Sequence, residues 1–122
     1  MKIGFVGLGN VGSKLAGSLL RNGYEVVVRD LNPEFVANFV ARGASSADSP
    51  KQLAEASDII ITCLPSPAAC SAVMEGNSTE EGVIAGLSDG KIWLEMSTTD
   101  ESEIRRIGAL VKAAGAEPVD CP

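Results

Sequence analysis

The stretch GLGNVG, residues 7–12, constrains the fold of this chain more than any other feature. The apolar run KIGFVG leads into it, and leucine and alanine residues at helical spacing follow it. A lone G-x-G-x-x-G pattern is weak evidence, but a strand before it and a helix after it are typical of a turn that binds a dinucleotide. Asp30 strengthens this interpretation, because an acidic residue at the end of the second strand, about 20 residues past the turn, completes the pattern.

Each glycine of the turn has a separate expected role. Gly7 makes the sharp turn out of the strand, Gly9 lets a pyrophosphate approach the backbone, and Gly12 lets the helix pack closely on the strand. The helix that follows presents free N–H groups and the positive end of its dipole to the phosphates. A glycine-rich turn with a purely structural use is the alternative. The residues predicted to bind a cofactor here are Gly7, Leu8, Gly9, Asn10, Val11 and Gly12.

Strand and helix patterns alternate along the whole chain. The expected strands are apolar throughout rather than alternating, which indicates a parallel sheet covered on both faces. The prediction is an α/β, Rossmann-type doubly wound and mainly parallel sheet in the order 3-2-1-4-5-6, with a short third strand near residues 44–46. The other strands are expected at residues 2–7, 25–30, 58–64, 91–96 and 116–120.

Three of the expected helices begin in the same way. The pairs Asn32-Pro33, Ser49-Pro50 and Ser66-Pro67 each place a capping oxygen before a proline, which suits the first helical position. A fifth helix is expected within residues 100–115, with Asp100 and Glu103 spaced as a capping box.

Composition excludes several classes of function. The length of 122 residues suits one domain, and a net charge of −6 argues against a nucleic acid or an anionic membrane as partner. No apolar run is long enough to span a membrane, and the N-terminus does not resemble a signal peptide, so a cytoplasmic location is expected. Three cysteines without Cys-x-x-Cys spacing, and no histidine, predict no metal site.

Arg29 and Asp30 make opposite demands on a dinucleotide. An aspartate suits the free ribose hydroxyls of NAD, whereas an arginine suits the extra phosphate of NADP. Because strand side chains alternate in direction, we expect Arg29 to point away from the ribose that Asp30 meets and to be a solvated charge at the strand end, with contact to the adenine as the alternative. The sequence therefore favours NAD, with NADP less favoured.

The chain resembles, over its whole length, the N-terminal domain of the β-hydroxyacid dehydrogenase family. That family includes 3-hydroxyisobutyrate dehydrogenase and is related to 6-phosphogluconate dehydrogenase. Four motifs carry the resemblance in order: the opening IGFVGLGNVGSKLAGSLLRNGYEVVVRD, then ITCLPSP, LEMSTTD and EPVDCP.

The resemblance implies further cofactor contacts. Leu64 and Pro65 would line the nicotinamide half, and Thr98 would contact the cofactor at the next strand edge. Members that prefer NADP tend to carry an arginine where this chain has Leu31, which supports NAD. Some NAD-using members have an asparagine at the position matched to Ala69, and that contact would be missing here.

The function implied is the NAD-binding domain of an oxidoreductase that oxidises a small β-hydroxy acid, or reduces the corresponding semialdehyde or keto acid, by hydride transfer. Residues 1–122 are expected to form a single dinucleotide-binding domain without the family's helical domain, so the catalytic base is expected outside this chain and the piece alone inactive. The whole protein is expected to take a small β-hydroxy acid and to form a homo-oligomer through the missing domain. A non-catalytic NAD-binding regulatory module is the alternative; a methyltransferase fits less well, because its turn usually reads G-x-G-x-G.

Overall fold

Parallel pairing joins all six strands into one sheet. The computed structural model describes residues 1–96 and 100–120, and within them the strand order is β3-β2-β1-β4-β5-β6. Every pair of neighbours is parallel, so the predicted doubly wound sheet is confirmed and is wholly rather than mainly parallel in this part of the chain. The strands are β1 (Lys2–Val6), β2 (Glu25–Arg29), β3 (Ser45–Ser46), β4 (Ile59–Thr62), β5 (Ile92–Glu95) and β6 (Glu117–Asp120).

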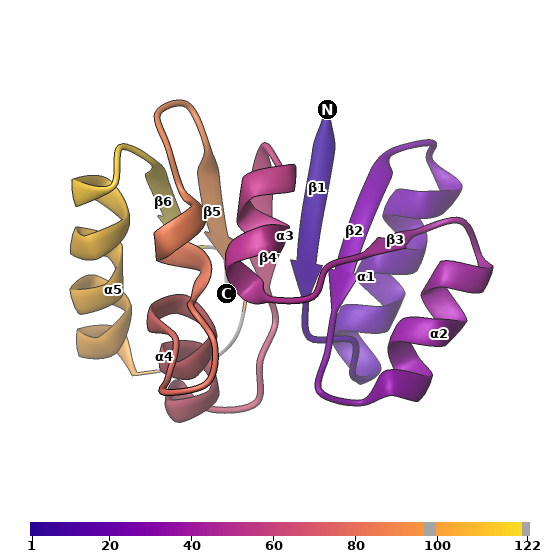
Figure 1. Ribbon diagram of the computed structural model, residues 1–122, viewed down its shortest axis with the longest axis horizontal. Helices are drawn as coiled ribbons and strands as arrows, with labels where there is room; N and C mark the ends of the chain where they lie inside the picture. The colour runs from indigo at the N-terminus through magenta and orange to yellow at the C-terminus, as the bar shows by residue number, and fades with distance from the viewer. Residues whose placement is uncertain (97–99, 121–122) are drawn as a thin grey trace.

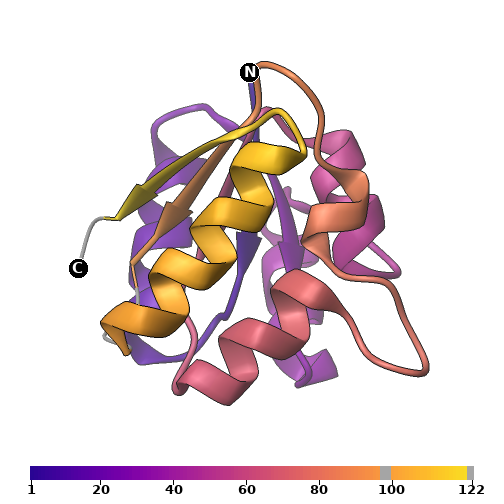
Figure 2. The same cartoon turned by 90° about the vertical axis from the view of Figure 1, so that its left-hand side faces the viewer.

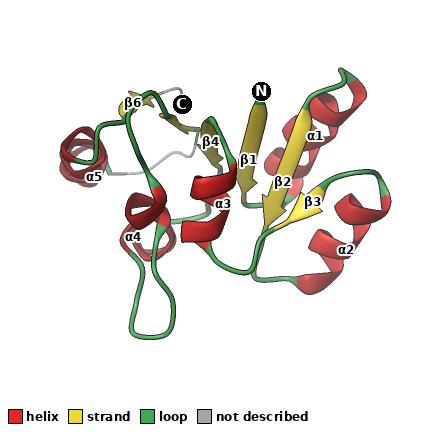
Figure 3. Cartoon of the chain, turned by 45° about the horizontal axis from the view of Figure 1, so that its top comes forward, coloured by secondary structure: helices red, strands yellow, loops and turns green. Residues whose placement is uncertain are grey.

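Helices cover both faces of this sheet (Figures 1 and 3). One face is covered by α1 and α2, and the other by α3, α4, α5 and a short 3₁₀ helix, η1. This division follows from right-handed crossovers on the two sides of β1. The bounds are α1 (Asn10–Arg21), α2 (Pro33–Ala41), α3 (Pro50–Ala56), α4 (Pro67–Glu75), η1 (Val83–Gly86) and α5 (Glu101–Ala113).

The predicted helix caps are present. The side chains of Asn32, Ser49 and Ser66 each accept a hydrogen bond from a backbone N–H in the first turn of α2, α3 and α4. Asp100 does the same for α5. The second half of the predicted capping box differs, because the Glu103 carboxylate accepts hydrogen bonds from Arg106 of the same helix.

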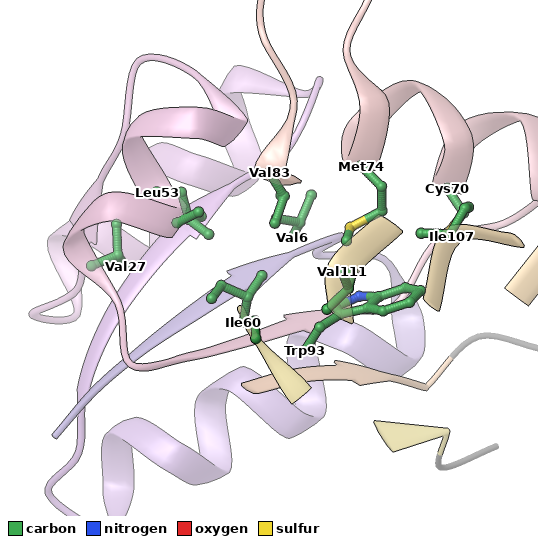
Figure 4. Packing of buried hydrophobic residues seen from close by; sticks show 12 residues of the cluster. Val6, Val27, Leu53, Ile60, Cys70, Met74, Val83, Trp93, Ile107 and Val111 are labelled. Atoms are coloured by element: carbon green, nitrogen blue, oxygen red, sulfur yellow. The ribbon is translucent and has the colours of Figure 1, made fainter. Parts of the chain in front are cut away.

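Two apolar clusters fill the space between the sheet and its helices. The cluster under α3, α4 and α5 is centred on Trp93 and Ile60, both fully buried (Figure 4). The cluster under α1 and α2 contains Phe5, Val28 and Phe39. Because both faces of β1, β2 and β4 are buried, these strands are continuous apolar runs in the sequence.

An ion pair joins α4 to α5, which lie side by side (Figure 2). Arg106 donates to both carboxylate oxygens of Glu75 at 2.7 Å, and the Ser71 hydroxyl donates to the same carboxylate. The Arg106 and Ser71 hydrogen bonds lower the pKa of Glu75 to about 2. None of the described helices is long and apolar enough to cross a membrane.

Candidate functional site: a cavity at the carboxyl edge of the sheet

A cavity of about 590 Å³ opens at the carboxyl edge of the sheet. It lies where the strand order changes direction, between β1 and its neighbour β4, which is where doubly wound sheets bind ligands. The glycine turn, the end of β2, the end of β4 and helix α4 surround it.

Two glycines of the turn are required by the backbone. Gly7 has a φ of +102°, a conformation that favours glycine, and a Cβ there would overlap the carbonyl oxygen of Cys63. A Cβ on Gly12 would overlap the carbonyl oxygen of Gly7 and approach the Phe5 ring to 3.3 Å. The turn, α1 and β4 are therefore packed as closely as their backbones allow.

Gly9 differs from these two, because its backbone is ordinary and the space beside it is open. Its φ is −71°, and a Cβ placed on it would have no described heavy atom within 4 Å. Gly9 is the N-cap of α1, and among the described residues no side chain caps this end or places an acidic group in its first turn. The first residues of α1 line the cavity, and a helix N-terminus whose N–H groups have no side-chain cap suits an anion.

Asp30 is held in place by two backbone donors. The N–H of Leu8 donates to Oδ2 over 2.7 Å, and the N–H of Asn32 donates to Oδ1 over 2.8 Å. Each oxygen retains acceptor capacity, since an ionised carboxylate has about four lone-pair sites. A ribose hydroxyl could donate to this carboxylate without displacing either bond.

Apolar side chains form the two walls of the cavity beside Asp30. Leu31, 95% exposed, and Phe35 contribute from the β2–α2 side. Ala69 and Val73 contribute from one face of α4, across the opening. Two apolar walls that face each other suit a flat heterocycle such as adenine.

Arg29 differs from the expected solvated charge. Its side chain is only 21% exposed, lines the cavity, and forms an ion pair with Glu80 in which Nη2 and Oε2 are 2.7 Å apart. Nη1 also donates to the carbonyl oxygen of Ala47 over 3.3 Å. The expectation was wrong because Glu80 is 51 residues away in sequence and its position depends on the loop after α4.

A buried polar network lies beside the cavity and was not anticipated. Glu95, 1% exposed, accepts hydrogen bonds from the Thr62 hydroxyl over 2.6 Å and from the Cys70 thiol over 3.3 Å. The Trp93 indole donates to the Thr62 hydroxyl, which links β4, β5 and α4. Burial first, and then the Glu95 charge, raise the pKa of the Cys63 thiol at the cavity, so this thiol is a poor nucleophile.

Most of the residues predicted from sequence lie around this one cavity. Leu8 is buried and contributes its backbone N–H to Asp30 rather than lining the cavity. Thr98 lies outside the described residues. Among the described residues, no group of three potential ligands is placed to hold a metal ion. The predicted residues that do line the cavity are Gly7, Gly9, Asn10, Val11, Gly12, Asp30, Leu64 and Pro65.

Residues 2–122 match the family model described as the NAD binding domain of 6-phosphogluconate dehydrogenase. The chain belongs to this family. The resemblance stated from the motifs is thereby confirmed, and the predicted NAD-binding domain is confirmed as far as a domain that binds NAD or NADP.

Two relatives are similar over nearly the whole chain. The mitochondrial 3-hydroxyisobutyrate dehydrogenase of Mus musculus is 33% identical over 98% of this chain and 35% of its own length. The 3-sulfolactaldehyde reductase of Escherichia coli (strain K12) is 37% identical over 98% of this chain and 39% of its own length. The chain therefore spans between a third and two fifths of these relatives.

A solved structure shows the same fold with a cofactor present. The structure of Psf3 in complex with NADP+ and 2-OPP has a TM-score of 0.89 and 25% identity, covering 98% of this chain and 42% of that chain. A protein with this fold and 25% identity to this chain thus binds NADP+. Preference between NAD and NADP has to come from the particular residues of each cavity.

Proposed function

We propose that this chain is the NAD-preferring cofactor domain of a dehydrogenase that acts on a small β-hydroxy acid or on the corresponding semialdehyde or keto acid. The observation that carries the proposal is the Asp30 carboxylate, held at the cavity by the N–H groups of Leu8 and Asn32. A fixed carboxylate accepts from ribose hydroxyls and repels a 2′-phosphate. The next residue is Leu31, at a position where a cation would favour NADP.

The cavity residues fit a dinucleotide in three parts. The pyrophosphate would lie over Gly9 and the start of α1, where there is open space and a helix N-terminus. The adenine would lie between the apolar walls of Leu31 and Val73. The nicotinamide would lie toward Leu64 and Pro65 at the end of β4.

A bound nicotinamide cofactor supplies hydride transfer to or from the carbinol carbon of the substrate. The role of this chain is to bind and orient the cofactor and to exclude water from its apolar side. No lysine or histidine is present among the described residues that line the cavity, and its two carboxylates, Asp30 and Glu80, are assigned to the adenosine end of the cofactor rather than to the hydroxyl proton of the substrate. We place that base, and the substrate pocket, outside this chain.

Titration of NAD and NADP separately into the purified chain tests the cofactor assignment. We expect NAD to bind more tightly. Tighter binding of NADP would contradict the Asp30 assignment, and no binding of either would contradict the domain's proposed function.

The dehydrogenase assignment needs a second measurement. Turnover of small β-hydroxy acids with NAD, assayed in the protein that contains this domain together with any part that follows it, supports an enzyme. NAD binding without turnover of any such acid or aldehyde would favour the alternative, a regulatory module that senses NAD.

A further inference from the structure

Arg29 is the only cation among the described residues that line the cavity. It lies one residue before Asp30, on the strand end that the proposed function places against the adenosine ribose. A guanidinium in this region is the group expected to favour a 2′-phosphate, because arginine binds phosphate oxygens through two parallel N–H donors. A chain that prefers NAD therefore has to prevent Arg29 from doing so.

The Glu80 carboxylate forms an ion pair with the Arg29 guanidinium. The Nη2–Oε2 distance is 2.7 Å, and the exposed fractions are 21% for the Arg29 side chain and 29% for Glu80. Because both are largely covered, this pair is less screened by water than a surface ion pair. The other terminal nitrogen of Arg29, Nη1, donates to the carbonyl oxygen of Ala47.

The loop after α4 holds Glu80 in this position. The side-chain oxygen of Asn77 accepts from the N–H groups of Thr79 and Glu80 at 2.8 and 3.0 Å, and the Asn77 N–H donates to the Glu80 carbonyl oxygen at 2.9 Å. A bridge between Gly76 and Glu81 closes the loop. The Glu80 carboxylate is thus positioned by a defined turn.

We propose that Glu80 helps to determine which cofactor the domain prefers. This role rests on the proposed binding of NAD(P) in this cavity. Glu80 disfavours NADP in two ways: it pairs with Arg29, the cation placed to meet the 2′-phosphate, and it adds a negative charge to the cavity. NAD has no 2′-phosphate and is little affected by either.

A four-variant comparison tests this role, with dissociation constants measured for NAD and NADP in each protein. Glu80→Gln frees Arg29 and should improve NADP relative to NAD roughly fivefold, the scale of one partly exposed charge interaction. Arg29→Gln leaves Glu80 unpaired and should weaken NADP more than NAD. The double variant, with neither charge, should return close to the wild-type ratio.

Glu81→Gln is the matched control. Glu81 is the next residue of the same loop, but it pairs with Lys51 at 3.0 Å, is 66% exposed and does not line the cavity. We expect its ratio of NADP to NAD affinity to equal that of the wild type. The gain in Glu80→Gln should also shrink as salt is added, because it is electrostatic.

Three outcomes would overturn the proposal. Equal changes for both cofactors in Glu80→Gln would mean that Glu80 only supports the loop. A double variant that keeps the full gain would mean that Arg29 is not the group released. Should Glu80→Gln fail to fold, an Arg29→Gln protein with an unchanged ratio would be sufficient to reject the role. If the wild type binds neither cofactor, the proposed function fails instead.

Discussion

The backbone N–H of Leu8 donates to Oδ2 of Asp30 over 2.7 Å and thereby ties the glycine turn to the end of β2. The glycine turn, which would bind the pyrophosphate, and the end of β2, which would bind the adenosine ribose, are thus joined directly by a hydrogen bond of the protein itself. The Asn32 N–H fixes the other oxygen of the same carboxylate. A preformed arrangement of this kind lowers the ordering cost of binding.

Exchange of two side chains should reverse the cofactor preference. Asp30→Asn combined with Leu31→Arg removes the charge that repels a 2′-phosphate and supplies a cation that binds it. Leu31 is almost fully exposed, so an arginine fits there without repacking. A charged hydrogen bond contributes about 1.5–3 kcal/mol, so NADP should gain more than tenfold relative to NAD. Calorimetric titration of both cofactors measures this, with Leu31→Ala as the control, and an unchanged preference would contradict it.

Gly9 and Gly12 should respond differently to the same added methyl group. Gly9→Ala should fold normally, because its backbone is ordinary and its Cβ meets open space, yet NAD should bind more weakly because the methyl group fills the pyrophosphate site. Gly12→Ala should lose about 1–3 kcal/mol of stability, because its Cβ overlaps the Gly7 carbonyl oxygen. Thermal melting and NAD titration of both variants separate the two effects. Normal NAD binding by Gly9→Ala would show that no phosphate approaches this residue.

Acid should destabilise the junction of α4 and α5. The hydrogen bonds from Arg106 and Ser71 lower the folded-state pKa of Glu75 to about 2. A lowered folded pKa means that the contribution of Glu75 to stability is complete above its ordinary pKa of 4.5 and is lost as the pH falls toward about 2. With allowance for solvent screening, the effect is about 1 kcal/mol.

Glu75→Gln isolates this contribution. Its melting temperature should fall less steeply than that of the wild type between about pH 4.5 and pH 2. The control, Glu101→Gln, removes a largely exposed helix-surface pair with Arg105 and should follow the wild type. Parallel pH profiles for Glu75→Gln and the wild type would be inconsistent with the role of this ion pair.

The chain alone should bind NAD but should not turn over a β-hydroxy acid. The described cavity lining has no lysine or histidine, and the apolar walls near Leu64 and Pro65 offer no group to bind a substrate carboxylate. Absorbance of NADH at saturating NAD, over a panel of small β-hydroxy acids, is the measurement. Turnover that is lost in a lysine variant such as Lys14→Gln or Lys51→Gln would place the base within this chain.

Much of the fold could be predicted because local and long-range signals agree. Ser49-Pro50 and Ser66-Pro67 mark helix starts through chemistry that acts within one turn, and the apolar strands can be buried only between two layers of helices. Gly7 and Asp30 were predictable because their spacing reflects one βαβ unit. The short helix η1 was not predicted, since four residues carry no helical period.

The polar contacts at the site were less predictable. Arg29 could not be paired with Glu80 from sequence, because the contact depends on how Asn77 folds the intervening loop. Strand alternation predicted that Arg29 points away from the ribose site, yet Arg29 and Asp30 both line the cavity, and alternation could not give the partner of Arg29. Glu95 reads as an ordinary strand-end charge, and only the packing of α4 against β4 and β5 shows it to be buried.

The location of the bound cofactor tests the central claim most directly. NAD titrated into ¹⁵N-labelled protein should shift the backbone amide resonances of Gly9, Asn10 and Leu8, which lie at the start of α1 and at the Asp30 contact. Resonances of Lys112, in the last turn of α5, and of Ala116, just before β6, should stay in place, because both lie at the amino edge of the sheet, opposite the cavity. Shifts confined to the α5–β6 region, with an unchanged glycine turn, would contradict the assignment of this cavity as the NAD site.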